Sequence, residues 1–590
     1  MEAGSRSNGD RPLRSARWFG PDNVVGMLHR ASVKAEGFSA AAVDGRPVIG
    51  ICNSWSELVH CNAHLRGLAQ AVKRGVLAAG GLPLEFPTIS LSENLMKPTT
   101  MLDRNLMSMD VEETIRAHPL DAIVLLAGCD KTVPAQLMGA ASAGVPAIML
   151  TGGPGQAAYF HGRELGVGTD LWEYTAEYRA GRLPKAEYAE LEAALIPSVG
   201  HCNELGTAST LAGVVEALGM ALPGTAAIPA VDARRAAAAE RTGRRAVELA
   251  GGELAPERIL TPAAFDNAIT LLMALGGSTN AVIHLLALAG RVGVDLDLER
   301  FDEISRRTPV LANLRPSGDH LFADLFRVGG VPAVLRELSP LLDLDATLIS
   351  GETLGAALEN VAEGVDGEVV APLSAPRHPQ GGLTVLEGNL APSGAVIKHV
   401  AASPELLQHR GRALVFEHMD DMIERIDEPD LPVEADSVMV LKNAGPRGAP
   451  GFPEWGMLPM PQKLLERGVR DMVRISDARM SGTAFGTVVL HIAPEAAAMG
   501  PLAAVEDGDE IVLDVERRRL DLALPDEEIK RRLDLLPEPQ PLYRRGYGAI
   551  YLEHVLQADE GADFDVLRAI PGEPTVTEPL GLLDGWIGGW

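Results

Sequence analysis

Short apolar segments that alternate with helical patterns constrain the fold of this chain most strongly. Between about residues 45 and 230 the order strand, turn, helix repeats, with strand candidates "RPVIGIC", "LPLEFPTIS", "DAIVLLAG" and "PAIMLTGGPG". The intervening "NAHLRGLAQAVKRGVLAAGG" has helical periodicity and ends in a double glycine. Strands that are apolar on both faces and alternate with helices are typical of a parallel sheet covered by helices on both sides. We therefore predict an α/β fold for this part of the chain.

A change of composition near residues 370–395 indicates a second structural unit. Residues 230–370 favour helices, and the next stretch, "APLSAPRHPQGGLTVLEGNLAPSGAVIK", is dense in proline and glycine. Short strand patterns follow it, and "DEIVLDVERRRLDLAL" is typical of a hairpin. We predict a β-rich barrel or sandwich with flanking helices. The expected division is an N-terminal arm at 1–44, an α/β domain at 45–380 and a β-rich domain at 381–590.

Charge and hydropathy narrow the classes of partner. The 590 residues carry a formal net charge of −28, which argues against nucleic acid or an anionic membrane surface as partner but leaves a small anionic substrate possible. The first twenty residues contain no apolar segment typical of a signal peptide. The most apolar helix candidate, "AFDNAITLLMALGGSTNAVIHLLALAG", contains Asp266, Asn267, Asn280 and His284, so we expect no membrane span. These features predict a cytoplasmic protein.

Four polar clusters stand where we expect strands of the α/β part to end. In open α/β sheets, ligands bind outside the carboxyl ends of the strands. The clusters are Cys61-Asn62, Ser92-Glu93-Asn94, Cys129-Asp130-Lys131 and His201-Cys202-Asn203. We therefore expect a binding site at this edge of the sheet.

The cysteines suggest a soft metal site, although small buried hydrophobic residues would explain each of them singly. All four lie within the first 202 residues, and Cys52 falls inside a strand, where we expect a core residue. Cys61, Cys129 and Cys202 are each flanked by Asn or Asp, and their wide spacing fits neither zinc fingers nor ferredoxins. Three thiolates leave one iron of an iron–sulfur cluster without a full set of protein ligands. Such an iron acts as a Lewis acid.

Oxygen ligands accompany the thiols. Glu93 and Asp130 form a carboxylate pair of the kind that suits Mg²⁺, although each taken alone is explained as a helix N-cap or a surface charge. Lys131 repels a cation unless it is neutral or chemically modified, and its alternative is a salt bridge to Asp130. Both readings of these three residues remain open on the sequence pattern alone.

Two loops of the C-terminal half carry further polar groups. "NAGPRGAPGFPEWGM" is a Gly/Pro loop that contains Glu454, and "ISDARMSGTAFGT" places Ser481 and Thr483 just after a strand. They are either simple turns or active-site loops that supply an oxygen ligand and a hydroxyl. "LGGSTNAVIH" is a small-residue turn that opens a helix, and helix N-termini bind carboxylates and phosphates.

Seven motifs in order resemble the dihydroxy-acid dehydratase / 6-phosphogluconate dehydratase family, from about residue 45 to 560. They are "CNAHL", "LAGCDKTVPAQLMGAAS", "GTASTLAGVVEALGMALPG", "LGGSTNAVIHLLA", "GNLAPSGAVIK", "GPRGAPGFPEWGM" and "SDARMSGTAFGTVVLHIAPEAA". The resemblance implies cluster ligands at Cys61, Cys129 and Cys202. It implies a magnesium site formed by Glu93, Asp130, Glu454 and an N-carboxylated Lys131. It also implies Ser481 as the catalytic base, with Thr483 beside it.

The third cysteine motif, "GHCNELGTAST", and the C-terminal "RRGYGAIYLEHVLQADEGADFDVL" resemble the branch of the family that dehydrates sugar acids such as arabinonate, xylonate and galactonate. Ser92-Glu93-Asn94 stands where amino-acid-biosynthetic members have Asp-Gly. This branch implies a [2Fe–2S] cluster, with [4Fe–4S] as the alternative, and a homodimer or homotetramer. His60 departs from the family, which often has proline before the first cysteine.

The implied reaction converts a 2,3-dihydroxy carboxylate into a 2-keto-3-deoxy acid and water. Mg²⁺ would hold the carboxylate and 2-hydroxyl, Ser481 would take the C2 proton, and the cluster iron would bind the leaving 3-hydroxyl. The nearest rival is dihydroxy-acid dehydratase of branched-chain amino-acid synthesis. A non-catalytic iron–sulfur protein would need neither the magnesium ligands nor the serine loop. A nucleotide-binding oxidoreductase is disfavoured because "TGGPG" is not a G-x-G-x-x-G fingerprint.

Overall fold

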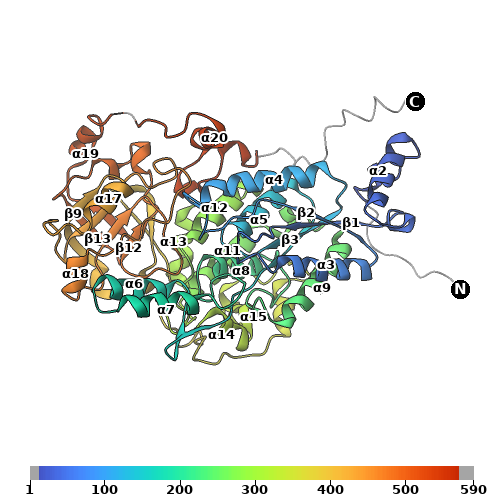
Figure 1. The fold of residues 1–590 in the computed structure, drawn as a ribbon, viewed down its shortest axis with the longest axis horizontal. Helices are drawn as coiled ribbons and strands as arrows, with labels where there is room; N and C mark the ends of the chain where they lie inside the picture. Colours follow the sequence, from blue (N-terminus) through green and yellow to red (C-terminus); the bar gives the residue numbers. More distant parts are fainter. Residues whose placement is uncertain (1–11, 538, 571–590) are drawn as a thin grey trace.

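The computed structural model describes residues 12–537 and 539–570. Figure 1 shows a parallel sheet with its helices toward one end of the molecule and a β-barrel toward the other. Both predicted units are therefore present, and the fold class is α/β with a C-terminal barrel. The arm before the sheet contains α1 (Ala16–Phe19) and α2 (Val24–Ala35), and residues 1–11 of it lie outside the described residues.

The N-terminal sheet has four parallel strands in the order β2-β1-β3-β4. They are β1 (Val48–Asn53), β2 (Leu82–Pro87), β3 (Ala122–Ala127) and β4 (Ala147–Thr151). All residues of β1, β3 and β4 are buried, which is why their sequences are apolar without alternation. Cys52 belongs to this core, as predicted.

Helices cover both faces of the sheet. Figure 1 shows α3 (Leu65–Ala78) and α9 (Ala233–Leu249) on one side, and α4 (Arg104–Ala117) and α5 (Thr132–Ala143) on the other. The pair α3 and α9 approaches closely because Gly75 and Gly243 have no side chains: a Cβ at either position would overlap the backbone of the opposite helix. The close approach fixes these helices against the sheet.

Further helices complete this part of the chain, and residues 230–370 are mostly helical, as predicted. The most apolar segment forms two helices rather than one, since Gly276 takes a left-handed conformation (φ 63°) and ends α11. Within the described part of the chain, no helix combines the length and apolarity that crossing a membrane requires. The helices are α6 (Thr169–Arg179), α7 (Lys185–Leu195), α8 (Thr207–Ala217), α10 (Pro256–Ile259), α11 (Pro262–Leu275), α12 (Asn280–Val292), α13 (Leu298–Arg307), α14 (Phe322–Arg327), α15 (Gly330–Glu337) and α16 (Leu354–Glu359).

The C-terminal half forms a closed barrel of strand order β10-β11-β12-β8-β7-β14-β13-β9, so of the two predicted architectures the barrel is correct. The predicted hairpin is β13 and β14. The strands are β7 (Thr384–Gly388), β8 (Ala391–Ile397), β9 (Gln408–Phe416), β10 (Val438–Leu441), β11 (Arg474–Ser476), β12 (Val488–Leu490), β13 (Glu510–Asp514) and β14 (Arg519–Leu522). Its helices are α17 (Met419–Arg425), α18 (Gln462–Glu466), α19 (Asp526–Leu533) and α20 (Gly546–His554).

Contacts distant in sequence hold the two units together. The expected boundary at residue 380 falls just before β7, and apolar packing continues across it, since Val385 and Val396 belong to the same core as the α/β helices. Arg291 of α12 forms a fully buried ion pair with Asp563, with 2.6 Å between Nε and Oδ2. These contacts connect the C-terminal half of the chain to the helices of the α/β part.

Candidate active site

The predicted site residues converge on one cavity of about 80 Å³ at the carboxyl edge of the parallel sheet. Eight of the nine line it: Cys61, Glu93, Cys129, Asp130, Cys202, Glu454, Ser481 and Thr483. The ninth, Lys131, is fully buried and contacts three of the lining carboxylates. The residues come from loops after three strands of the sheet, from the segment before α8 and from two loops of the barrel.

Adjacent strands bring Cys61 and Cys129 together. The loops after β1 and β3 carry them, and these strands are neighbours in the sheet. Asn62 joins the two loops, because its Oδ1 accepts a hydrogen bond from the Gly128 amide at 3.0 Å. Gly128 has no room for a side chain, since a Cβ there would lie 2.5 Å from the Cys61 carbonyl oxygen.

Cys202 reaches the cavity by another route, which corrects the expectation that its cluster directly follows a strand. After β4 the chain forms β5 (Ala158–Phe160), β6 (Arg163–Leu165), α6 and α7 before it returns. His201 then pairs in parallel with Pro154, and its carbonyl accepts a hydrogen bond from the Gly155 amide at 2.8 Å. This isolated pairing extends the carboxyl edge of the sheet beyond the end of β4, and it places Cys202 in the same cavity as Cys61 and Cys129.

The thiols differ in electrostatic environment. The pKa of Cys61 is lowered to about 6, first by a hydrogen bond with Cys129 and also by His60, whose Nε2 lies 3.5 Å from the Cys61 sulfur. The same contact raises the pKa of His60. The pKa of Cys129 is raised by its bond with Cys61 and by burial, and burial raises the pKa of Cys202. His60 therefore contacts the sulfur that is most easily deprotonated.

Three carboxylates surround the amine of Lys131. Its Nζ lies 2.8 Å from Asp130 Oδ2, 3.3 Å from Glu93 Oε2 and 3.3 Å from Glu454 Oε1. Burial raises the pKa of Glu93 to about 7, partly opposed by the charge of Lys131. Burial also opposes ionisation of Asp130, but Lys131 outweighs it and lowers the pKa of that carboxyl. In its unmodified form Lys131 thus makes the salt bridge to Asp130 that the sequence left open as the alternative, and two more ion pairs.

The chemistry of these groups fits the two expected cofactors. Carboxylate oxygens are the ligands that Mg²⁺ prefers, and thiols on one cavity suit an iron–sulfur cluster. In residues 12–537 and 539–570, no three His, Cys, Asp or Glu side chains already converge to hold a single metal ion. Lys131 Nζ lies between the carboxylates instead. Carboxylation of Lys131 would replace this cation with an oxygen ligand and leave its place to a metal.

The serine loop lies between β11 and β12. Ser481 Oγ and Thr483 Oγ1 are 2.9 Å apart, and Thr169 Oγ1 at the start of α6 donates to the Thr483 carbonyl at 3.0 Å. The loop approaches α6 so closely that a Cβ on Gly168 would overlap the Thr483 hydroxyl. The two hydroxyls therefore face the cavity as a fixed pair.

Asn280 and Arg479 are part of the site but were not identified from the sequence. Both are fully buried, and both donate to Glu454 Oε1, at 2.8 Å from Asn280 Nδ2 and 2.9 Å from Arg479 Nη1. Asn280 entered the sequence argument only as a polar group in an apolar helix. The available signal was that each is a polar residue inside one of the seven motifs, Asn280 in "LGGSTNAVIHLLA" and Arg479 in "SDARMSGTAFGTVVLHIAPEAA".

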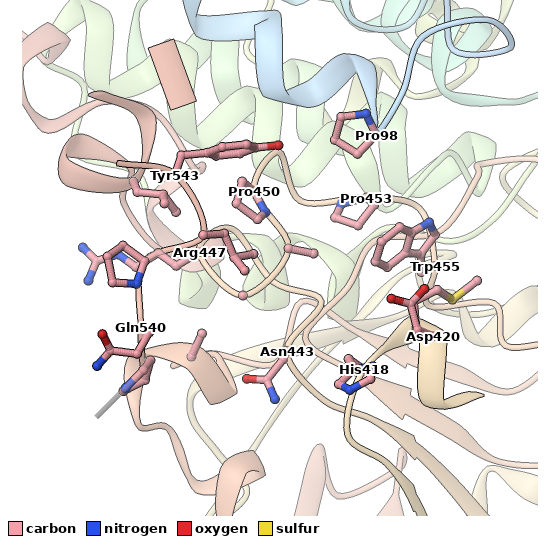
Figure 2. Close-up of a pocket in the computed structure, with 18 residues that line it drawn as sticks. Pro98, His418, Asp420, Asn443, Arg447, Pro450, Pro453, Trp455, Gln540 and Tyr543 are labelled. Carbon is pink, nitrogen blue, oxygen red and sulfur yellow. The ribbon is translucent and has the colours of Figure 1, made fainter. Parts of the chain in front are cut away.

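Two larger hollows flank the loop that carries Glu454. A cavity of about 1000 Å³ shares Glu454 and Ser481 with the small cavity, and its walls include Trp172 and Met422. A groove of about 770 Å³ lies against Pro450, Pro453 and Trp455 of the same loop (Figure 2). Trp455 lines both the groove and the larger cavity. The larger cavity gives the site room for a substrate longer than its reacting carbons.

Comparison with known proteins assigns the chain to a family of enzymes. The dihydroxy-acid/6-phosphogluconate dehydratase N-terminal model matches residues 46–357, and the corresponding C-terminal model matches residues 368–562. The chain belongs to this family of dehydratases, which are hydro-lyases.

Similar proteins include sugar-acid dehydratases. The chain is 53% identical to L-arabonate dehydratase of Azospirillum brasilense, over 95% of this chain and 97% of that protein. It is 50% identical to L-arabinonate dehydratase of Rhizobium leguminosarum bv. trifolii, with the same coverage. It is 45% identical to 6-deoxy-6-sulfo-D-gluconate dehydratase of Pseudomonas putida, over 96% and 98%. These relatives agree with the sugar-acid branch that the motifs indicated.

Proposed function

We propose that the protein dehydrates a sugar acid, a 2,3-dihydroxy carboxylate, to a 2-keto-3-deoxy acid and water. The observation that carries this proposal is the shared cavity, in which thiols, carboxylates and the Ser481–Thr483 pair face one another. Cys61, Cys129 and Cys202 would hold a [2Fe–2S] cluster. Glu93, Asp130, Glu454 and an N-carboxylated Lys131 would hold Mg²⁺.

When bound, Mg²⁺ and the exposed iron supply Lewis acidity at the substrate carboxylate, the 2-hydroxyl and the leaving 3-hydroxyl. Ser481 takes the proton from C2. A serine hydroxyl is a weak base, so its deprotonated oxygen needs stabilisation, and Thr483 Oγ1 at 2.9 Å is placed to donate a hydrogen bond to it. The C2–H electron pair forms the C2–C3 double bond as the C3–O bond breaks, and the proton that Ser481 took from C2 is passed to the departing hydroxide, which leaves as water. The resulting enol tautomerises to the 2-keto acid.

The larger cavity favours a substrate with a tail beyond C3. It opens from Ser481 and Glu454, so the chain beyond the reacting carbons has space of about 1000 Å³ next to the site. The relatives named for arabonate and sulfogluconate act on substrates of this kind. This combination favours a pentonate or hexonate over the short, branched dihydroxyisovalerate.

A substrate panel tests the proposed activity. Protein purified without oxygen and supplied with Mg²⁺ is assayed for 2-keto acid from arabinonate, xylonate, galactonate, gluconate and 2,3-dihydroxyisovalerate. We expect fast turnover of a pentonate or hexonate and little turnover of dihydroxyisovalerate. The reverse preference would assign the protein to branched-chain amino-acid synthesis instead.

The role of Ser481 has its own test. Ser481→Ala is expected to abolish turnover while the visible absorption of the cluster remains. Ser476→Ala is the matched control, because the Ser476 hydroxyl donates to the Leu441 carbonyl at 2.9 Å and does not line the cavity. Turnover near the wild-type rate in Ser481→Ala would show that the base lies elsewhere.

We further propose a cytoplasmic homodimer or homotetramer. All four cysteines are unpaired, as expected in a reducing compartment. Exposed apolar side chains on α2, Met27 and Leu28, offer a surface for assembly. Light scattering during size-exclusion chromatography measures the mass, and a mass of one chain would contradict the proposed assembly.

A further inference from the structure

Among the described residues, the hydrogen bonds to Glu454 all reach one of its two carboxylate oxygens, Oε1. Asn280 Nδ2 donates to Oε1 at 2.8 Å and Arg479 Nη1 donates to it at 2.9 Å, while Lys131 Nζ lies 3.3 Å from the same atom. Within the described part of the chain, no hydrogen bond reaches Oε2. Because Glu454 lines the small cavity, its second oxygen remains available to a ligand there.

Asn280 connects this carboxylate to the rest of the site. It is the first residue of α12 and is fully buried. Its Nδ2 lies 3.1 Å from the Met480 carbonyl, next to the proposed base, and 3.0 Å from Thr207 Oγ1 at the start of α8. Its Oδ1 accepts from Arg479 Nη1 at 3.1 Å. One amide thus joins two helix starts, the serine loop and the Glu454 loop.

Arg479 fixes the Glu454 loop from the other side. Its guanidinium is fully buried, and Nε donates to the Phe452 carbonyl at 2.6 Å. Two backbone hydrogen bonds add to this contact: the Arg479 amide donates to the Pro453 carbonyl, and the Arg479 carbonyl accepts from the Gly456 amide. A buried guanidinium needs a charged partner, and Glu454 supplies it. The loop on both sides of Glu454 is therefore tied to the loop that carries Ser481.

We propose that Asn280 and Arg479 are positioning residues that hold Glu454 Oε1 so that Oε2 is presented to the divalent cation of the site. This inference rests on the proposed function, since it assumes that Glu454 is a metal ligand. Partners that orient a ligating carboxylate act through the ligand, and their loss lowers metal affinity about 10- to 100-fold.

Metal affinity tests the proposal directly. Mn²⁺ replaces Mg²⁺ as a paramagnetic probe, and its binding to the cluster-loaded protein in bicarbonate buffer is titrated by electron paramagnetic resonance. The variants are Asn280→Ala and Asn280→Asp. Asn267→Ala is the control, because Asn267 is also buried and makes two hydrogen bonds of 2.8 Å to the Asp343 backbone, away from the cavity.

We expect both Asn280 variants to bind Mn²⁺ about 10- to 100-fold more weakly than Asn267→Ala, while cluster absorption is unchanged. Turnover should recover as Mg²⁺ is raised by the same factor, which a purely structural defect would not allow. Affinities within twofold of the control overturn the proposal. If an Asn280 variant does not fold, Arg479→Lys is measured instead, because it keeps the buried charge but lacks the planar fork. Wild-type affinity in Arg479→Lys then overturns the proposal, whereas no Mn²⁺ binding by the unmutated protein refutes the proposed magnesium site itself.

Discussion

Gly128 is the position where one added methyl group should separate the thiols. It lies between β3 and Cys129, and a Cβ there would be 2.5 Å from the Cys61 carbonyl oxygen and 2.8 Å from Asn62 Oδ1. Ordinary van der Waals contact begins near 3.4 Å, so the Cys61 loop must move by about 0.9 Å. Gly152 is a second close neighbour of Gly128, because a Cβ on Gly152 would lie 3.1 Å from the Gly128 Cα.

The expected cost has two parts. Overpacking of this kind destabilises a protein by about 1–3 kcal/mol. The larger consequence is at the site, where a misplacement of about 1 Å costs about a hundredfold in rate. We therefore expect Gly128→Ala to lose most of its bound iron and its visible absorption, and to turn over about a hundredfold more slowly.

Iron content per chain, visible absorption and urea unfolding measure these effects on anaerobically reconstituted protein. Gly67→Ala is the matched control, because Gly67 lies inside α3 and a Cβ there would meet nothing within 4 Å. That change should stabilise the helix by about 0.5–1 kcal/mol and leave the iron content unchanged. If Gly128→Ala holds as much iron as the wild type and turns over equally fast, the close contact of the Cys61 and Cys129 loops is not what assembles the site.

Three further predictions concern single side chains. Cys129→Ser should remove the visible absorption of the cluster while far-ultraviolet circular dichroism is unchanged, and an intact visible spectrum would contradict its assignment as a ligand. Gly168→Ala should displace the Thr483 hydroxyl and lower kcat at least about tenfold without loss of iron, which an unchanged kcat would contradict. Burial lowers the pKa of His491 to about 3 from an ordinary 6.5. As the pH falls below 6.5, His491 therefore becomes protonated in the unfolded chain but stays neutral in the folded protein, and the free energy of unfolding decreases. Asparagine tolerates the left-handed backbone at this position (φ 58°) and does not titrate, so His491→Asn is the test variant. As the pH falls from 8 to 5, the unfolding free energy of the wild type should fall by about 2 kcal/mol relative to that of His491→Asn. A difference between the two proteins that does not change with pH would refute the burial argument.

Local patterns were enough to predict the parallel sheet and the edge at which the site lies. β1, β3 and β4 are apolar throughout because both of their faces are covered, and this is visible in the sequence without knowledge of their neighbours. The polar residues directly after β1 and β3 had to lie near one another, since parallel strands end at a common edge. The seven motifs added the identities of Glu454 and Ser481, which no periodicity reveals.

The barrel shows where local patterns stop. Its strands were recognised from short apolar runs, but a barrel and a sandwich share those runs. The barrel closes because β10 pairs with both β9 and β11. Which strands pair depends on contacts between segments that are distant in the chain, and local sequence patterns do not report these contacts. The position of Cys202 was not predicted for the same reason. Cys61 and Cys129 follow regular strands, whereas Cys202 follows a single isolated bridge between Pro154 and His201.

The sequence by itself determined which segments are buried, where the strands of the sheet end and which residues carry reactive groups. Only the tertiary structure decided that Glu454 and Ser481, more than three hundred residues beyond Cys129, share its cavity. It also decided that Asn280 and Arg479 orient Glu454 through Oε1. The physical reason is that periodicity reports how much of a side chain is buried, whereas the partner of a buried polar group is chosen by the packing of elements that are distant in the chain.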